Sequence, residues 1–373
     1  MAQKVFVIPD KFKGTLTAPQ AAEAIARGWR QSRPGDILEL LPMSDGGDGF
    51  GEIVSGLLGA ERQTVGTVDA AHRPCEASWW WHEPSCTALV ESARVIGLAQ
   101  LPPEQFHPFE LDTSGLGAVF QAALARGARH CLVGIGGSAT NDGGFGVARS
   151  LGWKFFNEQD QPITRWTELH TLAQIRPPES TQLFDELIVA VDVQNPLLGP
   201  EGCTRIYGPQ KGLRPEDFGL AERCLERMAG LIEKKLGLSC RKDPGAGAAG
   251  GLGFGLRCFE NAKLEPGFAL FSRYAGLTKR LETAQLVITG EGAIDHSTLM
   301  GKGVGEIAHL CRQLNVPCIG LAGVVPDPAE AKQLFRSVHA LTPELTSVAE
   351  AKAHPAVWLE RMAAQVAAGW SSE

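Results

Sequence analysis

Apolar runs alternate with amphipathic segments at the start of the chain. Residues 5–8 form a β-branched apolar run, which predicts a buried strand. Residues 18–30 place apolar side chains on one helical face, and Thr17 stands where an N-cap belongs. Residues 36–41 predict a second strand. A strand, a helix and a second strand in this order indicate a parallel sheet with helices packed on it.

The end of the chain shows the same order, with a strand at residues 286–289, a helix at 305–314 and a strand at 318–321. In the middle, β-rich runs at residues 62–68 and 77–82 flank a turn and indicate a mixed sheet. The remaining predictions are strands at residues 87–91 and 187–191 and helices at residues 116–126, 146–151, 215–236 and 250–259.

This pattern predicts an α/β fold of two α/β domains with a cleft between them. Residues 1–66 and 284–373 are expected to form one discontinuous domain, Rossmann-like or flavodoxin-like. Residues 67–283 are expected to form an inserted α/β domain with a mixed sheet. A cleft between two domains is a usual place for a ligand.

Composition narrows the class of protein. Hydrophobic residues make up 44% and charged residues 21% of the 373 residues, which is enough for a sizeable core. The net charge of -7 argues against a nucleic-acid partner. The nine cysteines form no CxxC pair, the N-terminus lacks a signal-peptide pattern, and no apolar run approaches the roughly 18 residues of a membrane span. We therefore expect a cytoplasmic protein with reduced thiols and no membrane partner.

Glycine, with 44 residues, gathers in short clusters between apolar segments. The cluster at residues 134–144 differs from the P-loop pattern, but its backbone N–H groups and small hydroxyls suit a polyphosphate. Its candidate nucleotide-binding residues are Gly136, Gly137, Ser138, Thr140 and Asn141. A second cluster places Gly245, Gly247 and Gly250 in GxGxxG spacing, although the residues before it do not form a strand pattern.

Charged side chains follow the predicted strands, and ligands of open α/β sheets bind beyond the carboxyl ends of strands. Asp10 and Lys13 follow the first strand, and Asp45 follows the second within the motif SDGGDG. Carboxylate oxygens suit Mg²⁺, which makes Asp45 a candidate metal ligand.

The same placement recurs in the second half of the chain. Asp192 ends the strand at residues 187–191, where a catalytic base or a metal ligand is commonly placed. Arg205 and Lys211 can neutralise phosphate or carboxylate charge. Two further carboxylates and a lysine follow the strand at 286–289, namely Glu291, Asp295 and Lys302.

These clusters, in this order, resemble the glycerate kinase type 1 family. The matching segments span nearly the whole chain and are PDKFKGTLTA (residues 9–18), SDGGDG (44–49), GIGGSATNDGG (134–144), NPLLGPEG (195–202), YGPQKG (207–212), DPGAGAAGGLG (243–253) and TGEGAID (289–295). An ordered series of this length is specific, unlike any single glycine-rich loop.

The resemblance implies a bacterial, cytosolic kinase that transfers the γ-phosphate of ATP to a hydroxyl of D-glycerate with Mg²⁺. It favours 2-phosphoglycerate over 3-phosphoglycerate as the product, and a homodimer is compatible with it. The ATP phosphates are then expected on the two glycine clusters, and Mg²⁺ on Asp45 or Asp192.

Phosphoryl transfer asks the protein mainly for positioning and charge neutralisation. Asp192 is expected to accept the proton of the substrate hydroxyl, with Asp295 as the second choice. Lys13, Arg205 and Lys211 are expected to bind the glycerate carboxylate or to stabilise the transferring phosphoryl group. The expected substrate-binding residues are Asp10, Lys13, Arg205, Lys211 and Glu291.

The chain departs from the family pattern at three places. Ala293 stands where the family usually carries Arg before Ile-Asp, and Val304 stands where Pro follows Lys302 in the family. The segment at residues 113–117 is one residue shorter than the usual pattern. A lost Arg predicts weaker binding of phosphate or carboxylate, which leaves the substrate less defined than the reaction class.

Three alternative functions stay open. The first is a kinase of another small hydroxy acid, and the second is an NAD-dependent oxidoreductase, based on the GxGxxG spacing. The third is a non-catalytic regulator that binds a nucleotide or a sugar acid. Charged residues at four predicted strand ends favour catalysis over simple binding.

Overall fold

A parallel sheet of five strands organises the two ends of the chain. The computed structural model describes residues 2–47, 49–299 and 303–371, and its contacts divide the chain into two units. Unit 1 comprises Met1–Asp45 and Phe268–Glu373, and unit 2 comprises Gly46–Gly267. The strand order of unit 1 is β13 (Ser337–Thr342), β12 (Cys318–Val324), β11 (Leu286–Ala293), β1 (Lys4–Pro9) and β2 (Ile37–Leu40), with every neighbouring pair parallel.

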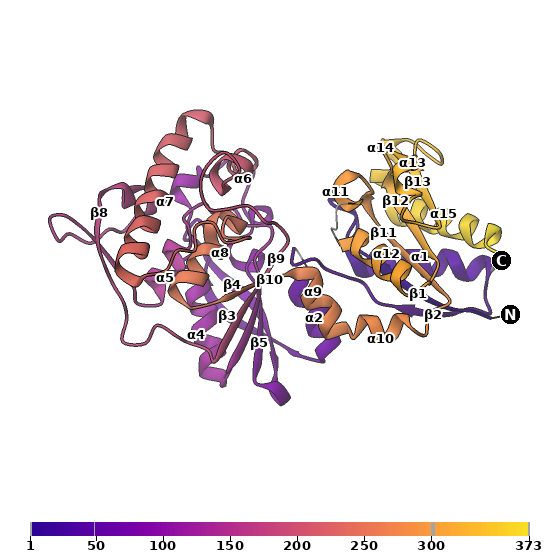
Figure 1. Ribbon diagram of the computed structural model, residues 1–373, viewed down its shortest axis with the longest axis horizontal. Coiled ribbons are helices and arrows are strands. Elements are labelled where there is room, and N and C mark those ends of the chain that lie inside the picture. The colour runs from indigo at the N-terminus through magenta and orange to yellow at the C-terminus, as the bar shows by residue number, and fades with distance from the viewer. Residues whose placement is uncertain (1, 48, 300–302, 372–373) are drawn as a thin grey trace. The chain divides into compact units, whose positions relative to one another are not determined.

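β1 lies between β11 and β2, so the first strand of the chain lies inside the sheet, and the strands from the end of the chain, β11 to β13, all lie on one side of it (Figure 1). Val5 pairs with Leu286 and with Leu38. The strand order reverses at β1, and ligands of open α/β sheets bind at such a reversal, beyond the carboxyl ends of the strands.

Helices cover this sheet, and the first of them follows its sequence pattern closely. α1 begins after Thr17, which confirms Thr17 as the predicted N-cap, and the structure adds a capping box in which the Thr17 hydroxyl accepts the backbone N–H of Gln20. A Cβ at Gly28 would lie 2.0 Å from the backbone oxygen of Glu360, so only glycine lets α1 approach α15 this closely. The helices whose residues lie mainly in unit 1 are α1 (Ala18–Ser32), α9 (Gly267–Ala275), α10 (Leu277–Leu281), α11 (His296–Leu299), α12 (Gly303–Gln313), α13 (Pro328–Ala331), α14 (Val348–Ala353) and α15 (Pro355–Gly369).

Unit 2 contains a mixed sheet of six strands. Its order is β10 (Lys263–Pro266), β9 (Glu186–Val191), β6 (His130–Gly134), β5 (Thr87–Glu91), β4 (Pro74–His82) and β3 (Glu61–Val68). The first four strands are parallel to one another, while β4 is antiparallel to both β5 and β3. An antiparallel pair of strands, β7 (Lys154–Asn157) and β8 (Leu172–Arg176), forms a separate small sheet.

The run of three tryptophans on β4 shows how this sheet is covered. Trp79 and Trp81 lie in the main core of unit 2, whereas Trp80 packs against α2, where a Cβ at Gly51 would lie 2.4 Å from its ring. The rings alternate between the two faces, as the period of a strand requires. The helices of unit 2 are α2 (Phe50–Leu58), α3 (Ala93–Ile96), α4 (Leu116–Arg126), α5 (Phe145–Ser150), α6 (Cys203–Lys211), α7 (Pro215–Leu236) and α8 (Ala248–Phe259), with short 3-10 helices η1 (Glu83–Ser85), η2 (Leu98–Gln100), η3 (Pro108–Glu110) and η4 (Trp166–Thr171).

The α/β fold with one parallel and one mixed sheet confirms the predicted fold class. The division into units differs from the predicted boundaries at residues 66 and 283. β3 pairs with β4 over its whole length and α2 packs on β4 and β5, so residues 46–66 belong with unit 2. At the other end, residues 268–283 of α9 and α10 belong with unit 1. The cleft expected between the domains stays a prediction.

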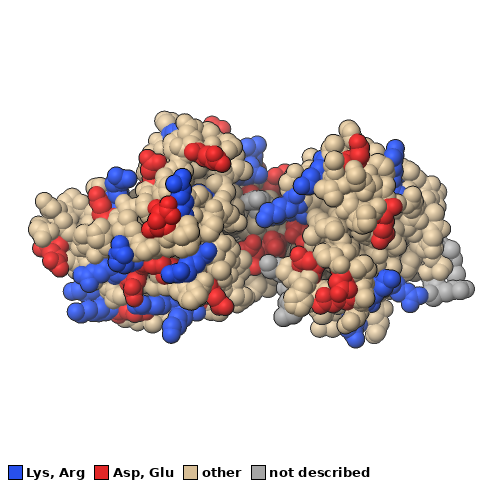
Figure 2. All heavy atoms as spheres, turned by 90° about the horizontal axis from the view of Figure 1, so that it is seen from above, with Lys and Arg blue, Asp and Glu red and all other residues tan. Residues whose placement is uncertain are grey.

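Lys and Arg are interspersed with Asp and Glu on the face that Figure 2 displays. This mixture agrees with the small net charge of -7. Over the described residues, no helix is long and apolar enough to cross a membrane.

Candidate active site

Carboxylates gather at the carboxyl ends of the central strands of unit 1. Asp10 follows β1 directly, and the backbone N–H of Met43 donates to the Pro9 oxygen at 3.0 Å, which carries the segment before Asp45 alongside β1. A Cβ at Gly303 would lie 3.7 Å from Asp10 Oδ2 and 3.8 Å from the Asp45 Cβ, so the two acids flank the start of α12.

Glu291, on β11, faces this pair. Burial raises the pKa of Glu291 to about 7, and the carboxylates of Asp10, Asp295 and Asp45 add to the shift, although Thr298 Oγ1 donates to Glu291 Oε1 at 2.7 Å. A raised pKa of this origin marks a place where negative charge is crowded. Such a place favours a cation and is a candidate site for chemistry.

The other predicted residues of unit 1 occupy the same sheet edge in different roles. Lys13 is exposed in the tight loop after β1, and its backbone nitrogen would lie 3.3 Å from a Cβ at Gly292. Asp295 Oδ1 accepts the Ser297 backbone N–H at 2.8 Å and the Ser297 hydroxyl at 2.6 Å, so this carboxylate starts α11. Lys302 and Asp48, the second acid of the SDGGDG motif, lie outside the described residues.

In unit 2, the two predicted glycine clusters pack backbone against backbone. The Gly143 N–H donates to the Gly250 oxygen at 3.0 Å, and a Cβ at Gly250 would lie 2.0 Å from the Thr140 oxygen. Gly250 also has a φ of 68°, in the left-handed region that favours glycine. The predicted helix at residues 250–259 is present as α8, although residues 249–251 have left-handed rather than helical angles.

The segment after β9 joins the same assembly. The Gly247 N–H donates to the Asn195 oxygen at 2.9 Å, and a Cβ at Gly245 would lie 3.0 Å from Val191 at the end of β9. The SDGGDG motif reaches it as well, since a Cβ at Gly136 would lie 2.5 Å from the Gly47 Cα. Segments far apart in the sequence thus meet at the carboxyl ends of β6 and β9.

Lys211 lies beneath the cluster at residues 134–144, on α6. Its ammonium donates to Ser138 Oγ at 3.0 Å and to the Thr140 oxygen at 2.7 Å, and its side chain is buried. Burial lowers the pKa of Lys211 to about 8, while the nearby Cys203 and Asp142 oppose that shift. The lysine expected to touch substrate therefore holds the glycine-rich loop.

Asp192 and Arg205 are both exposed. Asp192 follows β9. Burial raises the pKa of Tyr207 to about 12, and the negative charge of Asp192 adds to this shift. The Arg205 guanidinium lies 5.9 Å from the centre of the Phe218 ring on α7. Arg205 thus extends from α6 toward α7 at this position.

Two carboxylates that organise the site were missed by the sequence reasoning. Asp142 is fully buried and accepts hydrogen bonds from the backbone and hydroxyl of Thr113 and from the backbone N–H groups of Gly144 and Gly146. Burial, with Asp112 nearby, raises the pKa of Asp142 to about 6. Glu91 accepts the Gly49 N–H at 2.7 Å. The signal for Glu91 is its place at the end of an apolar strand, the same signal that singled out Asp192.

Oxygen donors for a hard cation are present in both units, with Asp45 in unit 1 and Asp192 in unit 2. No group of three or more His, Cys, Asp or Glu side chains in the described residues has the geometry of a metal site. Carboxylate oxygens, such as those of Asp10, Asp45 and Glu291, are the type of ligand that Mg²⁺ prefers.

The glycine clusters have the features of a phosphate cradle. Gly137, Gly143 and Gly144 have positive φ values, and the Thr140 hydroxyl and Asn141 Oδ1 are buried without a hydrogen-bond partner among the described residues. Buried polar atoms of this kind ordinarily find partners, which a bound group can supply. A dinucleotide fingerprint does not fit, because the GxGxxG segment follows the turn after α7 and no strand precedes it between residues 237 and 247.

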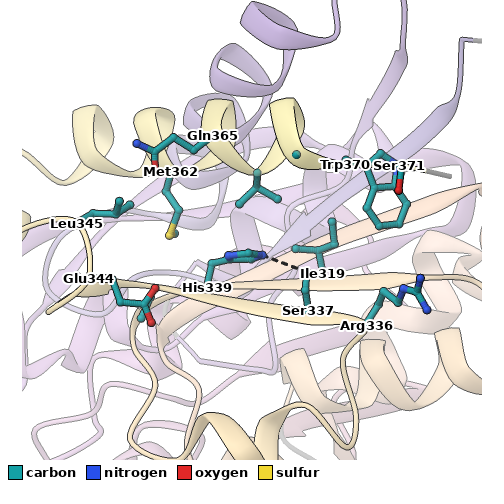
Figure 3. Close-up of a pocket in the computed structure, with 13 residues that line it drawn as sticks. Ile319, Arg336, Ser337, His339, Glu344, Leu345, Met362, Gln365, Trp370 and Ser371 are labelled. Carbon is teal, nitrogen blue, oxygen red and sulfur yellow. Dashed lines mark hydrogen bonds between the residues drawn. The ribbon is translucent and has the colours of Figure 1, made fainter. Parts of the chain in front are cut away.

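A separate cavity of about 410 Å³ lies in unit 1 beside α15 (Figure 3). His339 on β13 projects into it beneath Met362 and Gln365 of α15, and His339 Nε2 lies 3.1 Å from Ser337 Oγ. Burial lowers the pKa of His339. The candidate site residues in the described part of the chain do not line this cavity.

Comparison with known proteins identifies the family. Residues 5–371 match the model of the glycerate kinase family.

The chain belongs to the glycerate kinase family.

Relatives of similar length agree with this membership. The chain is 36% identical over 368 residues to glycerate kinase of Halalkalibacterium halodurans, covering 97% of each protein. It is 36% identical over 328 residues to glycerate 2-kinase of Escherichia coli, covering 87% of this chain and 86% of the relative. A Salmonella typhimurium LT2 crystal structure assigned as glycerate kinase 2 superposes with a TM-score of 0.82 at 32% identity, covering 99% of this chain and 98% of that chain.

Family membership makes the protein a kinase, a transferase with an alcohol group as acceptor. This confirms the predicted reaction class over the oxidoreductase and the non-catalytic regulator.

Proposed function

We propose that the protein transfers the γ-phosphoryl group of ATP to the 2-hydroxyl of D-glycerate, giving ADP and 2-phosphoglycerate. The observation that carries the proposal is that the two glycine clusters pack against each other and that the second of them is bonded to the turn that begins at Asp192. The glycerate 2-kinase of Escherichia coli among the relatives supports the 2-hydroxyl over the 3-hydroxyl.

Backbone N–H groups of the glycine clusters hold the ATP phosphates in this proposal. The nucleotide-binding residues are Gly136, Gly137, Ser138, Thr140, Asn141, Gly245, Gly247 and Gly250. Lys211 lies beneath the first cluster and stabilises bound negative charge through the loop. Mg²⁺, held by Asp45 or Asp192, supplies charge neutralisation when bound.

Asp192 accepts the proton as the hydroxyl oxygen bonds to the γ-phosphorus and the bond from that phosphorus to the β-phosphate oxygen breaks. Asp192 is exposed and near the glycine clusters, which suits this role better than Asp295, whose oxygen already caps α11. Lys13 and Arg205 are exposed cations that can bind the glycerate carboxylate. Asp10 and Glu291 complete the substrate-binding set.

The test couples the purified protein, Mg-ATP and D-glycerate to enolase without phosphoglycerate mutase, with ADP release followed in parallel. Phosphoenolpyruvate together with ADP is expected. ADP without phosphoenolpyruvate would assign the 3-hydroxyl, once substrate-independent hydrolysis is subtracted. An absence of glycerate-dependent ADP would redirect the search to other small hydroxy acids.

An Asp192→Asn variant tests the proton acceptor, because an amide keeps the shape of the side chain but cannot take the proton. We expect kcat to fall by a factor of about 10²–10⁴, the usual contribution of general base catalysis. A folded variant with near-normal turnover would remove Asp192 from this role.

Three finer expectations belong to the same proposal. We infer that the protein is of the type 1 subgroup, from the ordered motifs, that it works in the cytoplasm, and that it can form a homodimer. Size measurement in solution tests the homodimer.

A further inference from the structure

Three polar side chains lie on one face of α6. Thr204, Tyr207 and Lys211 are separated by three and four residues, the spacing that aligns side chains along a helix. Each of them reaches a different loop atom of the candidate site. The helix thus presents a polar edge, defined by these three residues, toward the glycine-rich loop and the Asp192 turn.

Thr204 and Lys211 hold the glycine-rich loop. Asn141 Nδ2 donates to Thr204 Oγ1 at 3.1 Å, and both residues are fully buried. Lys211 binds Ser138 Oγ and the Thr140 oxygen, as described above. Burying an amide or ammonium group without a hydrogen-bond partner costs free energy, so these bonds hold the loop in position.

Tyr207 holds the turn that follows Asp192. Its hydroxyl donates to Asn195 Oδ1 at 2.5 Å, and Asn195 Nδ2 donates to the Glu201 oxygen at 2.8 Å. The Asn195 oxygen in turn accepts the Gly247 N–H. Tyr207 is thereby connected to the second glycine cluster through one residue, Asn195, whose side chain binds Tyr207 and whose backbone oxygen binds Gly247.

We propose that the polar edge of α6 sets the position of the nucleotide loop relative to the Asp192 turn, with Thr204 and Tyr207 as positioning residues. This inference rests on the proposed function, which assigns phosphate binding to the loop and proton transfer to the turn. Phosphoryl transfer requires donor and acceptor roughly in line, and a misplacement of about 1 Å can cost about 100-fold in rate. One helix that anchors both segments makes their relative position a property of α6.

The test compares Thr204→Val, Tyr207→Phe and the double variant as full-length proteins, with Mg-ATP and D-glycerate. Each single change removes one hydroxyl and keeps the volume of the side chain close to the original. We expect kcat to fall about 10–100-fold in each single variant, with the KM for ATP near the wild-type value. The double variant should lose less than the product of the two single losses, because both act on one relative position.

Asn157→Ala is the matched control. Asn157 Oδ1 accepts the backbone N–H groups of Gln159 and Gln161, so this side chain, like that of Asn195, binds backbone of its own turn in unit 2. That turn lies after β7 and carries no candidate site residue. Wild-type kcat in Asn157→Ala with reduced kcat in Tyr207→Phe supports the inference, whereas wild-type kcat in Tyr207→Phe, or losses that simply multiply, overturns it.

Amide hydrogen exchange gives a readout that does not depend on the substrate. We expect Tyr207→Phe to speed exchange at residues 137–141, although its hydroxyl contacts the Asn195 turn and not that loop. Faster exchange confined to residues 195–201 would overturn the inference. If the wild-type protein were inactive on D-glycerate while Tyr207→Phe still sped exchange at residues 137–141, the proposed function would be contradicted and the role of α6 would remain.

Discussion

In unit 1 the candidate residues beyond the central parallel strands are mainly carboxylates, whereas in unit 2 they are mainly glycines and hydroxyls with the buried ammonium of Lys211, beside the exposed Asp192 and Arg205. Burial raises the pKa of Glu291, and the nearby carboxylates of Asp10 and Asp45 add to that shift. In unit 2 the buried carboxylate of Asp142 instead receives four hydrogen bonds from Thr113 and from the start of α5.

The difference shows how the carboxyl ends of parallel strands, in two separate sheets, can suit ligands of opposite charge. Crowded carboxylates favour a cation, and glycine loops above a buried lysine favour an anion. A kinase needs both, because its nucleotide arrives as a complex of phosphate with a divalent metal. Substitutions of glycines in unit 2 test the part of this comparison that concerns the anion, and substitutions on β11 of unit 1 test the part that concerns the cation.

Gly250→Ala should have the largest effect. A left-handed φ costs a non-glycine residue about 1–2 kcal/mol, and the clash with the Thr140 oxygen adds about 1–3 kcal/mol because backbone must move. The free energy of unfolding, measured in urea, should fall by the sum of these two penalties. The kcat should fall more than tenfold as the two glycine clusters separate.

Gly237→Ala isolates the contact from the φ penalty. Gly237 has a φ of 70°, close to the 68° of Gly250, but a Cβ there would meet nothing within 4 Å among the described residues. We expect the free energy of unfolding of Gly237→Ala to fall only by the φ penalty, and its kcat to stay at the wild-type value. Equal losses in the two alanine variants would mean that packing between the clusters contributes little.

The elements of the fold were predictable where one local signal dominates. The spacing at residues 116–126 and 215–236 gives the bounds of α4 and α7, since periodic apolar positions and a proline or glycine mark both helices. The sequence analysis missed β13 and α15, although β13 completes the parallel sheet of unit 1 and α15 packs against that sheet. α14 and β7 were missed as well, because short segments carry too few residues for a period to show.

The site was predictable as a set of segments but not as a set of contacts. Glycine clusters and acids at strand ends stand out in the sequence, and the structure brings residues 134–144 and 245–251 together. The role of Lys211 was not visible, because its burial depends on where α6 packs. Asp142 was hidden inside a motif already interpreted as a phosphate loop, and its partner Thr113 is distant in sequence.

Glu291→Gln tests the carboxylate side through the pH dependence of stability. The folded protein binds the Glu291 proton more tightly than the unfolded chain, because its pKa is about 7 instead of the ordinary 4.5. This stabilisation is complete below about pH 4.5 and is lost as pH rises to about 7, by about 2–3 kcal/mol. The variant should therefore show a flatter decline in unfolding free energy over that range.

Glu260→Gln is the matched variant in unit 2. Burial raises the pKa of Glu260 to about 7 as well, although hydrogen bonding opposes this shift, and no neighbouring carboxylate in the described part of the chain contributes to it. Salt should shrink the pH effect of Glu291, whose neighbours repel it, more than that of Glu260. An unchanged pH slope in Glu291→Gln would show that the pKa of Glu291 is not raised in solution.

Ala293→Arg makes the smallest change and adds a cation to the crowded carboxylates. Ala293 is two residues after Glu291 on β11, so both side chains point to the same face of the strand. An Arg there should lower the pKa of Glu291 and bind the carboxylate of the acceptor, and the KM for D-glycerate should fall about two- to tenfold, where tenfold equals about 1.4 kcal/mol. Ala349→Arg, at an exposed position of α14, adds the same charge to unit 1 away from β11 and should leave KM unchanged. An equal fall in both variants would assign the effect to net charge, and no fall in Ala293→Arg would mean that the acceptor carboxylate binds elsewhere.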